Sequence, residues 1–384
     1  MKLTEIQFSS YTDQSPDWIL EGCTLGDINL LVGKNASGKT RTLNIISSLA
    51  NLLAGDLKLP PESVSVEVVF EDAGTQVRYT LKCENEQIVQ EELRKNDELL
   101  LERSADGPGK IWAEKLKNFI DFQPPVDELA VAVRRDAIQH SFLASLYNWG
   151  KATRHFHFGT SMGQNFLAGF LPAEQSAEPG TRKLDDLDTK DTNLVVPIFA
   201  KGRKDLGKEY VQQVIGDMAR LDYKLENIVL ETIESSDSED KKHIASGLQV
   251  KEEDLPWPTS QPEMSAGMFR ALSLLIQVDY AALAGSPSCI IIDDVGEGLD
   301  YSRSITLIKL LIEKAQSNPN MQLILSSNDR FVMNGVPLEY WSVIQRLPGK
   351  AKIYNYRNAK ELFDEFEFTG LSNFDFFASN YLSI

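Results

Sequence analysis

The hydrophobic positions at the start of the chain follow two different periods. Residues 2–8 and 26–32 predict strands, and the second is expected to be a continuous buried run that ends in a glycine-rich turn. From Thr40 to about Leu53 the apolar residues recur at helical spacing and line one side of a predicted helix. The chain therefore opens with a strand–turn–helix unit.

The next part of the chain alternates with a period of two. Residues 63–72 and 75–85 flank Asp72-Ala73-Gly74 and predict a β-hairpin. Further strands are expected at 98–103, 110–113 and 128–136. The apolar spacing of residues 138–156 is helical.

The middle of the chain is less regular. Residues 172–192 carry turn-forming and charged residues without periodicity, which is typical of a loop. A helical pattern returns over about 205–222. The acidic stretch 231–243 predicts an exposed loop whose charges face solvent.

These segments predict an α/β fold with a split core. Residues 1–55 and 258–384 are expected to form one core with a mixed sheet, and residues 56–257 to be inserted as a β lobe and a helical region. The chain has 384 residues, of which 42% are hydrophobic and 25% charged, so it can bury a sizeable core without disulfides.

The cysteines and the apolar runs bear on the compartment. Cys23, Cys83 and Cys289 are scattered, and no Cys/His cluster has zinc spacing, so buried thiols are expected rather than disulfides or a structural metal. The N-terminus has no apolar signal-peptide core, and no apolar run reaches the roughly 18 residues of a membrane span. A cytoplasmic protein without membrane association is expected.

The net charge of −17 bears on nucleic-acid binding. Contacts with phosphates supply most non-specific affinity for DNA, so this charge argues against a generally basic binding surface. A local basic groove stays open as an alternative. Direct DNA binding is therefore not favoured.

The strongest motif is GKNASGKT, which lies between the predicted buried strand and the predicted helix. In such a P-loop, glycines let backbone N–H groups turn toward phosphate oxygens, and the helix N-terminus adds partial positive charge. Lys39 is expected to reach the β- and γ-phosphates of ATP, and the Thr40 hydroxyl to bind Mg²⁺. The residues assigned to nucleotide binding here are Gly33, Asn35, Ala36, Ser37, Gly38, Lys39, Thr40 and Arg41.

A second motif, CIIIDDVGEGLD, begins at Cys289. Its first four residues predict a short buried strand. An acid at the carboxyl end of such a strand would face the P-loop in an open α/β sheet, as the Walker B residue does. Asp293 is therefore assigned to Mg²⁺, directly or through water, and Asp294 to orienting the attacking water.

A third motif lies one helix before that strand. In residues 263–283, Ser265 can cap a helix with one buried apolar face. Its MSAGM resembles the signature motif of ABC-type ATPase heads, usually written LSGGQ, with Ser265 and Gly267 at the matching serine and second glycine. GEGLD resembles their D-loop and ends at Asp300. The surrounding sequence resembles the SMC, RecF and OLD-type branch more than membrane transporters.

The resemblance implies a P-loop NTPase of the ABC-head type. Two heads would pack head to tail, with each ATP between one P-loop and the partner's signature. The Ser265 hydroxyl and the helix N-terminus behind it would address the γ-phosphate. ATP binding would close a homodimer or higher homo-oligomer, and hydrolysis would release it.

Two residues depart from the family pattern. Asn328 stands where a switch histidine is expected, and asparagine can hydrogen-bond water or phosphate but cannot take a proton. Asp294 stands for a glutamate and is one methylene shorter, a misplacement that can cost about 10²-fold in rate. With Lys39 these are the assigned catalytic residues, and they predict slow hydrolysis. Gln139 is the predicted Q-loop residue, with an ordinary exposed helix position as the alternative.

Other features favour structural roles. His155 and His157 would face the same side of a strand, but no carboxylate or cysteine is spaced to complete a metal site. Phe8 or Tyr11 could stack on adenine, although core packing is the preferred interpretation. The C-terminal aromatic residues either cap the core or dock a partner. They are Phe374, Phe376, Phe377 and Tyr381.

Chains of this OLD-like type resemble ATPase components of bacterial anti-phage defence systems, in which an ATPase assembly controls a toxic effector. The sequence after Asp293 leaves no room for a Toprim nuclease domain, so a separate nuclease or toxin is expected as the effector. Two other interpretations stay open. Asp294 and Asn328 fit a non-hydrolysing nucleotide-binding scaffold, and a DNA-repair or SMC-like head would need coiled-coil arms, for which the insert has no sustained heptads.

Overall fold

The computed structural model describes residues 1–12, 15–105, 108–166, 189–236, 242–285 and 287–378. The chain forms two compact units, and neither is continuous in sequence. The first contains residues 1–153, 287–291 and 319–384, and the second contains residues 154–286 and 292–318. Strand β14 (Ser288–Asp293) passes from the first unit into the second.

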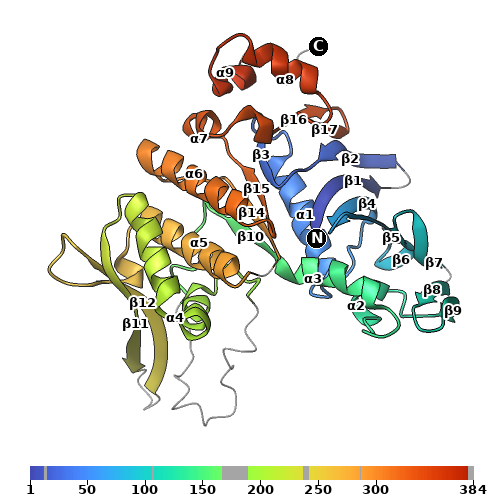
Figure 1. Ribbon diagram of the computed structural model, residues 1–384, viewed down its shortest axis with the longest axis horizontal. Helices are drawn as coiled ribbons and strands as arrows, with labels where there is room; N and C mark the ends of the chain where they lie inside the picture. Colours follow the sequence, from blue (N-terminus) through green and yellow to red (C-terminus); the bar gives the residue numbers. More distant parts are fainter. Residues whose placement is uncertain (13–14, 106–107, 167–188, 237–241, 286, 379–384) are drawn as a thin grey trace. The chain divides into compact units, whose positions relative to one another are not determined.

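The first unit is built on a large mixed sheet (Figure 1). Its strand β3 (Ile28–Val32) is buried over its whole length and pairs in parallel with β15 (Met321–Ser326) and β16 (Trp341–Leu347). Such apolar strands are typical of parallel sheets covered on both faces. The strand order within this unit is β14-β15-β3-β16-β17-β2-β1-β4-β5-β6-β7-β8-β9.

The far half of this sheet is antiparallel. Strand β1 (Lys2–Thr12) pairs with β2 (Ser15–Thr24) and β4 (Ser63–Asp72), and a series of hairpins continues from β4. The strands of that series are β5 (Thr75–Glu84), β6 (Gln87–Lys95), β7 (Glu98–Ser104), β8 (Gly109–Ala113) and β9 (Asn118–Phe122). Strand β17 (Lys350–Asn355) joins the two halves, because it pairs with β16 and β2.

Helices cover the core of the first unit. The predicted apolar stripe of α1 (Lys39–Leu53) is buried, and α1 packs against α3 (Ala144–Ala152). The helix residues on that stripe meet the apolar side chains of the sheet in one continuous core. The remaining helices of this unit are α2 (Ala130–Val133), η1 (Ser141–Leu143), α7 (Arg330–Gly335), η4 (Leu338–Tyr340), α8 (Lys360–Glu367) and α9 (Asn373–Ala378).

The second unit is mainly helical. Helix α4 (Val195–Arg220), which is kinked at Gly207, packs against α5 (Ala266–Leu283). Lys314 of α6 (Tyr301–Ser317) joins these helices, because its ammonium lies 2.5 Å from carboxylates of Asp217 on α4 and Asp279 on α5. By length and composition alone α5 could cross a membrane, but 67% of it is buried inside the structure, as in a core helix.

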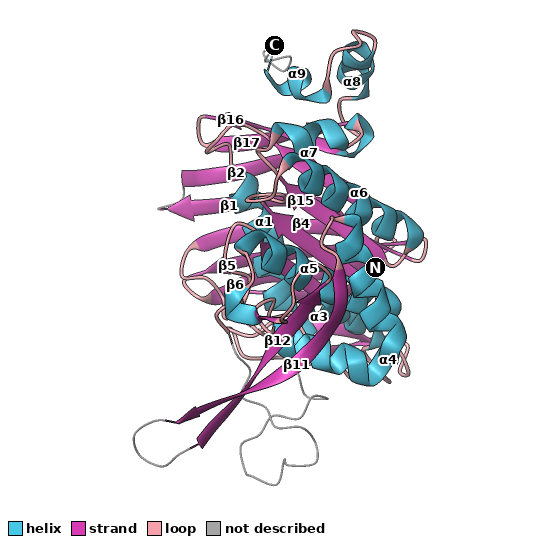
Figure 2. Ribbon diagram, turned by 90° about the vertical axis from the view of Figure 1, so that its left-hand side faces the viewer, coloured by secondary structure: helices cyan, strands magenta, loops and turns pink. Residues whose placement is uncertain are grey.

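A small sheet and one edge strand complete the second unit. Figure 2 shows β11 (Leu225–Ser236) and β12 (Lys242–Glu252) as a long antiparallel ribbon, to which β13 (Thr259–Ser260) adds. The single turn η3 (Gln261–Glu263) then leads into α5. Strand β10 (Thr153–His157) ends beside β14, where Phe158 N–H donates to the carbonyl of Asp293 at 3.0 Å.

The predicted mixed α/β sheet is confirmed, as are the hairpin at 63–84 and the first helix. The predicted strand at 128–136 is wrong, because its centre forms the short helix α2. The buried carboxylate of Glu91 accepts hydrogen bonds from Ala130 N and Val131 N and so supplies the partners that the start of this helix needs. Only residues 144–152 of the predicted helix 138–156 are α-helical before β10 begins.

The predicted exposed loop at 231–243 is also wrong where it is described. Residues up to Ser236 belong to β11 and those from Lys242 belong to β12, while 237–241 lie outside the described residues. Apolar partners at the base of the ribbon, such as Ile228 opposite Val250, stabilise a pairing that the acidic local composition does not reveal. Most of the predicted loop 172–192 lies outside the described residues.

The compact units do not share the predicted domain boundaries. Strands β4 to β9, which fall in the predicted insertion, belong to the same unit as the P-loop, and the second unit begins only at residue 154. The division into a core of residues 1–55 and 258–384 and an insertion of residues 56–257 stays a prediction.

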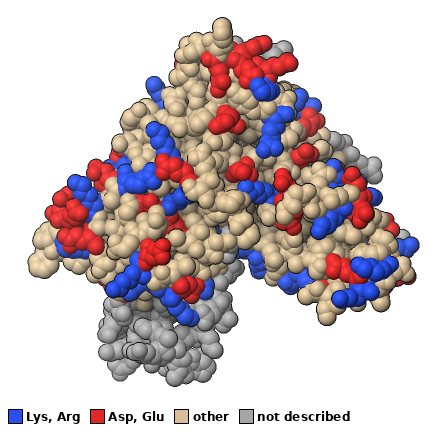
Figure 3. Space-filling view, in the orientation of Figure 1, with Lys and Arg blue, Asp and Glu red and all other residues tan. Residues whose placement is uncertain are grey.

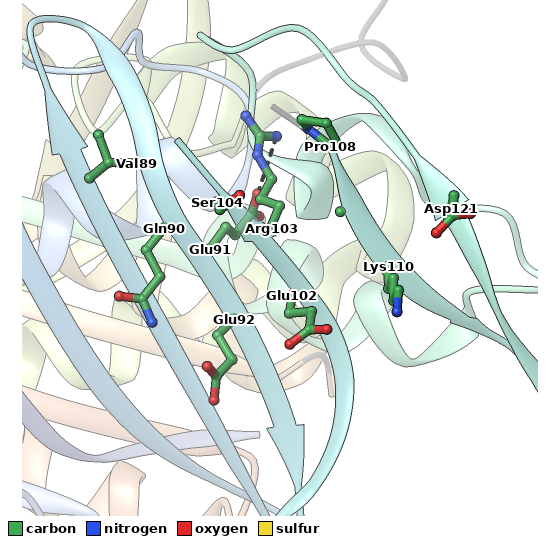
Figure 4. Close-up of a pocket in the computed structure, with 11 residues that line it drawn as sticks. Val89, Gln90, Glu91, Glu92, Glu102, Arg103, Ser104, Pro108, Lys110 and Asp121 are labelled. Atoms are coloured by element: carbon green, nitrogen blue, oxygen red, sulfur yellow. Dashed lines mark ion pairs between the residues drawn. The ribbon is translucent and has the colours of Figure 1, made fainter. Parts of the chain in front are cut away.

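Strands β6 to β9 surround an open hollow of about 600 Å³, seen in Figure 4. Beside it lies the buried ion pair between Arg103 and Glu91, whose nearest atoms are 3.5 Å apart. Glu91 also accepts a hydrogen bond from Tyr79, and burial raises its pKa despite these partners. Arg103 donates to the carbonyls of Pro125 and Glu128, so the pair fastens the sheet to the segment that leads into α2.

Candidate functional site

The P-loop follows directly from the buried strand β3. A Cβ atom on Gly33 would lie 2.5 Å from Ser37 Oγ and 2.9 Å from the carbonyl of Ile344, so a side chain has no space there. Ala36 (φ 60) and Gly38 (φ 110) adopt left-handed conformations that turn the loop, and α1 begins at the next residue. Arg346 holds the turn through a 3.0 Å hydrogen bond to Ala36 O.

The interior of this loop carries polar groups suited to an anion. Lys39 is buried, and its Nζ donates to the carbonyls of Gly33 (2.8 Å) and Lys34 (3.4 Å). Ser37 Oγ is also buried and has no hydrogen-bond partner among the described residues. A buried hydroxyl without a partner is costly unless a ligand or water satisfies it, so the loop fits a bound phosphate.

Other residues of the motif face outward. Asn35 and Thr40 are exposed, and Thr40 is the first-turn residue to which Mg²⁺ was assigned. Arg41 places its guanidinium 4.4 Å above the ring of Trp18, so it contacts the strands beside α1. Phe8 packs against the same ring and against the core, in agreement with the core-packing role preferred for this residue over adenine stacking.

Asn328 lies close to the P-loop in the sheet. Strands β15 and β3 are parallel neighbours with Ser326 opposite Leu31, so Asn328 and Gly33 follow their strands at the same edge. Asn328 is exposed, and Asp329 after it caps α7 by accepting hydrogen bonds from two backbone N–H groups. Its assignment to water or the γ-phosphate stays a prediction.

Gln139 has a different environment. Its side-chain oxygen accepts a hydrogen bond from Lys115 N at 3.2 Å, in the turn between β8 and β9. Its backbone N–H is held by Asp136, and its carbonyl accepts from Glu114 N. These contacts give Gln139 a structural role in the antiparallel part of the sheet, while its assignment to the nucleotide stays a prediction.

The acidic pair lies at the end of β14 and at the start of the turn that follows it. Asp293 ends β14 and is 5% exposed. Asp294 follows with a left-handed backbone (φ 54), and its carbonyl accepts from Glu297 N. The chain then turns through Gly296 and Gly298 to Asp300, which caps α6 by accepting from Arg303 N.

Two histidines lie on β10 beside this acidic end. The rings of His155 and His157 are 4.2 Å apart, as expected for residues on one side of a strand. Burial and the neighbouring His157 lower the pKa of His155 to about 4, although the nearby Asp293 opposes this shift. His155 is therefore neutral at pH 7. Their position near Asp293 could not be predicted, because most of β10 was expected to be helical.

The signature (residues 264–268) lies at the start of α5. Ser265 caps the helix as predicted, with its Oγ accepting from Met268 N at 3.3 Å. Ser265 and Ala266 are exposed, so the N-terminus of an 18-residue helix is open on this side. A Cβ atom on Gly267 would lie 3.1 Å from the carbonyl of Gly298, so the signature and the D-loop (residues 296–300) approach backbone to backbone.

Several polar side chains hold this region, and sequence reasoning missed them. Gln261 is fully buried and donates to carbonyls of residues 163, 164 and 166, while Gln164 donates to Met264 O at 2.7 Å. Arg303 donates to Leu221 O and stacks over Tyr223. All of these contacts join segments far apart in sequence, so no local pattern could indicate them.

Among the described residues, no group of three His, Cys, Asp or Glu side chains could hold a metal. Mg²⁺ at nucleotide sites uses only one or two protein oxygens with water and phosphate, so the Thr40 hydroxyl and the Asp293 carboxylate suit it chemically.

Phe376 is buried among the rings of Trp341, Phe363 and Phe366, which favours the capping role for this aromatic tail. Tyr381 lies outside the described residues.

No family model matches this sequence, and no curated protein matches it. Solved structures do match. One is an Smc head bound to the C-winged helix domain of ScpA, with a TM-score of 0.54 and 11% sequence identity over 95% of this chain and 100% of that chain. Another is an Smc head domain with an extended coiled coil, bound to the C-terminal domain of ScpA derived from Pyrococcus furiosus. Its TM-score is 0.48, at 10% identity over 95% of this chain and 99% of that chain.

The first of these similarities establishes the fold. This chain shares the α/β fold of that Smc head. On the face shown in Figure 3, basic and acidic side chains are interspersed, and acidic ones gather over α8.

Proposed function

We propose that this chain is an ATPase head that binds ATP and Mg²⁺ at its P-loop. The observation that carries the proposal is the loop of residues 33–40, which holds the buried Lys39 and the buried hydroxyl of Ser37, for which the described part of the chain offers no hydrogen-bond partner. Phosphate oxygens would accept from the loop N–H groups and from Lys39. Thr40 and Asp293 would hold Mg²⁺, which neutralises phosphate charge when bound.

The head acts, in this proposal, as part of a homodimer or higher homo-oligomer. The exposed N-terminus of α5 at Ser265 supports this, because it offers a partial positive charge and a hydroxyl to an anion from outside. A second copy would bring its ATP to this surface, and Asp300 would lie at the same junction. Closure would then depend on ATP, as in the head-to-tail pairing that the resemblance implies.

Hydrolysis is proposed to be slow. Asp294 would orient the attacking water, and Asn328 would hydrogen-bond water or the γ-phosphate without taking its proton. The resemblance to OLD-like chains extends this proposal to a role in bacterial anti-phage defence. There the head would regulate a separate nuclease or toxin.

The direct test is Lys39→Ala, with Lys34→Ala as the matched control in the same loop. Lys34 is exposed, whereas Lys39 is buried within the loop. We expect Lys39→Ala to weaken ATP binding in a calorimetric titration and to abolish phosphate release, while Lys34→Ala changes neither more than about twofold. ATP binding of Lys39→Ala equal to that of the wild type would refute the P-loop assignment.

A second candidate function is a nucleotide-binding scaffold that does not hydrolyse ATP. The observation in its favour is that Asp294 has a left-handed backbone, so an aspartate there has a conformational reason apart from chemistry. The two functions differ in one measurement. Phosphate release by the wild type no faster than that of Lys39→Ala, together with tight ATP binding, would select the scaffold.

A further inference from the structure

Arg270 lies on α5 just after the signature and makes three hydrogen bonds, all to main-chain carbonyls outside its own helix. Its Nε donates to Thr160 O at 2.8 Å, and its Nη2 donates to Gly159 O at 3.2 Å. Its Nη1 donates to Glu297 O at 3.0 Å. One guanidinium therefore joins its own helix to two segments that are distant in sequence, residues 159–160 and the D-loop.

Each of these segments borders the acidic end of β14. Gly159 and Thr160 follow Phe158, whose N–H donates to the carbonyl of Asp293. Glu297 belongs to the D-loop, and its N–H donates to the carbonyl of Asp294. Arg270 thus connects the signature helix to both segments that are hydrogen-bonded to the acidic pair.

The guanidinium of Arg270 is packed tightly against the D-loop. A Cβ atom on Gly298 would lie 2.5 Å from Arg270 Nη1, and one on Gly267 would lie 3.1 Å from Gly298 O. The guanidinium therefore rests on the D-loop backbone at the point where the D-loop meets the signature. Removing it would leave a gap beside Gly298, whose left-handed backbone (φ 80) is free to shift.

We propose that Arg270 is a positioning residue that fixes the signature and the D-loop as one preformed surface for a second head carrying ATP. This inference rests on the proposed function. The planar guanidinium suits the task because its donors point in fixed, divergent directions. A lysine donates from a single atom, so it can hold one segment but not both.

The proposal separates two properties of the protein. ATP binding by an isolated head depends on the P-loop, which Arg270 does not contact through any of its three hydrogen bonds. Pairing of heads depends on the signature surface. Loss of Arg270 should therefore raise the protein concentration at which ATP turnover per head is half-maximal, without changing the affinity of a dilute head for ATP.

The experiment compares Arg270→Ala and Arg270→Lys with Ser273→Ala and the wild type. Ser273 is the matched control, because it is on the same helix and donates to Met162 O in the same segment, away from the D-loop. We expect Arg270→Ala to raise the half-maximal concentration about tenfold or more, since loosening a positioned group by an ångström can cost up to about 10²-fold. The half-maximal concentration of Arg270→Lys should lie between those of Arg270→Ala and the wild type.

The outcomes are distinguishable. The protein concentration is therefore counted in heads that bind ATP, because a merely structural loss then lowers the turnover per total protein but leaves the half-maximal concentration of ATP-binding heads unchanged. That result, or a shift no larger than that of Ser273→Ala, overturns the role of Arg270. If the wild type binds no ATP, or its turnover per head does not depend on concentration, the proposed ATP-driven pairing itself fails.

Discussion

Asp294 occupies a backbone position that restricts which residues can stand there. Its φ is 54, in the left-handed region, immediately after the buried strand β14. Aspartate and asparagine enter this region several-fold more often than other non-glycine residues. A left-handed conformation costs most other residues roughly 1–2 kcal/mol. The backbone thus gives a physical reason for an aspartate where the family pattern has a glutamate.

Three substitutions separate this backbone role from chemistry. Asp294→Asn keeps the backbone preference and removes the charge, so we expect unchanged stability and turnover lower by about 10²-fold or more. Asp294→Ala loses both, and roughly 1–2 kcal/mol of strain should lower its Tm by about 1–3 °C in a chain of this length. Asp294→Glu extends the carboxylate by one methylene at a similar strain cost, and we expect faster turnover because reach limits the wild type.

The assay is steady-state phosphate release at saturating ATP, with thermal unfolding measured on the same preparations. Asp97→Ala is the matched control, because Asp97 is also left-handed (φ 63) but lies in the hairpin turn between β6 and β7. It should lose stability without losing turnover. Wild-type turnover in Asp294→Asn would show that the carboxylate does not orient the water, and an unchanged Tm in Asp294→Ala would refute the backbone argument.

Two further predictions concern stability. Phe376→Ala removes a ring buried against three other aromatic rings, and we expect it to lower the free energy of unfolding by about 3–5 kcal/mol in a denaturant titration. Phe374 is half-buried, so Phe374→Ala should lower it less. Equal losses would contradict the capping role. Burial raises the pKa of Asp279 from its usual 3.8 to about 7, against the opposing charge of Lys314. The folded state therefore keeps a proton that the unfolded chain releases, and the free energy of unfolding falls as pH rises from about 4 to about 7. Asp279→Asn should remove this fall, so its stability relative to the wild type should rise between pH 5 and pH 8; a constant difference would contradict the assignment.

The parts of the molecule that could be predicted are those specified by local sequence. The strand–turn–helix at the P-loop, the hairpin at 63–84 and the Ser265 cap each depend on residues only a few positions apart. Short-range patterns fix a turn type, a cap or a face of a helix. These features appear in the structure where the sequence placed them.

The missed features depend on partners from elsewhere in the chain. Helix α2 starts where Glu91, on another strand, satisfies its first N–H groups, so its β-branched residues misled the prediction. The acidic sequence of β11 forms a strand because it pairs with β12, and a reading of the local sequence does not reveal that pairing. Arg270 looks like an ordinary helix residue until the loop after β10 and the D-loop are beside it.

The strand order around β3 has a consequence for how the protein is made. Strand β3 and helix α1 are synthesised well before the two strands that pair with β3, which begin at residues 321 and 341. A buried strand whose residues are apolar except for Asn29 therefore has no partner strands until β15 and β16 are synthesised, which favours association with chaperones or slow, late folding. The P-loop is complete as a sequence within the first 40 residues, yet it gains the sheet that supports it only near the end. Nucleotide binding would thus report that a newly made chain has finished folding.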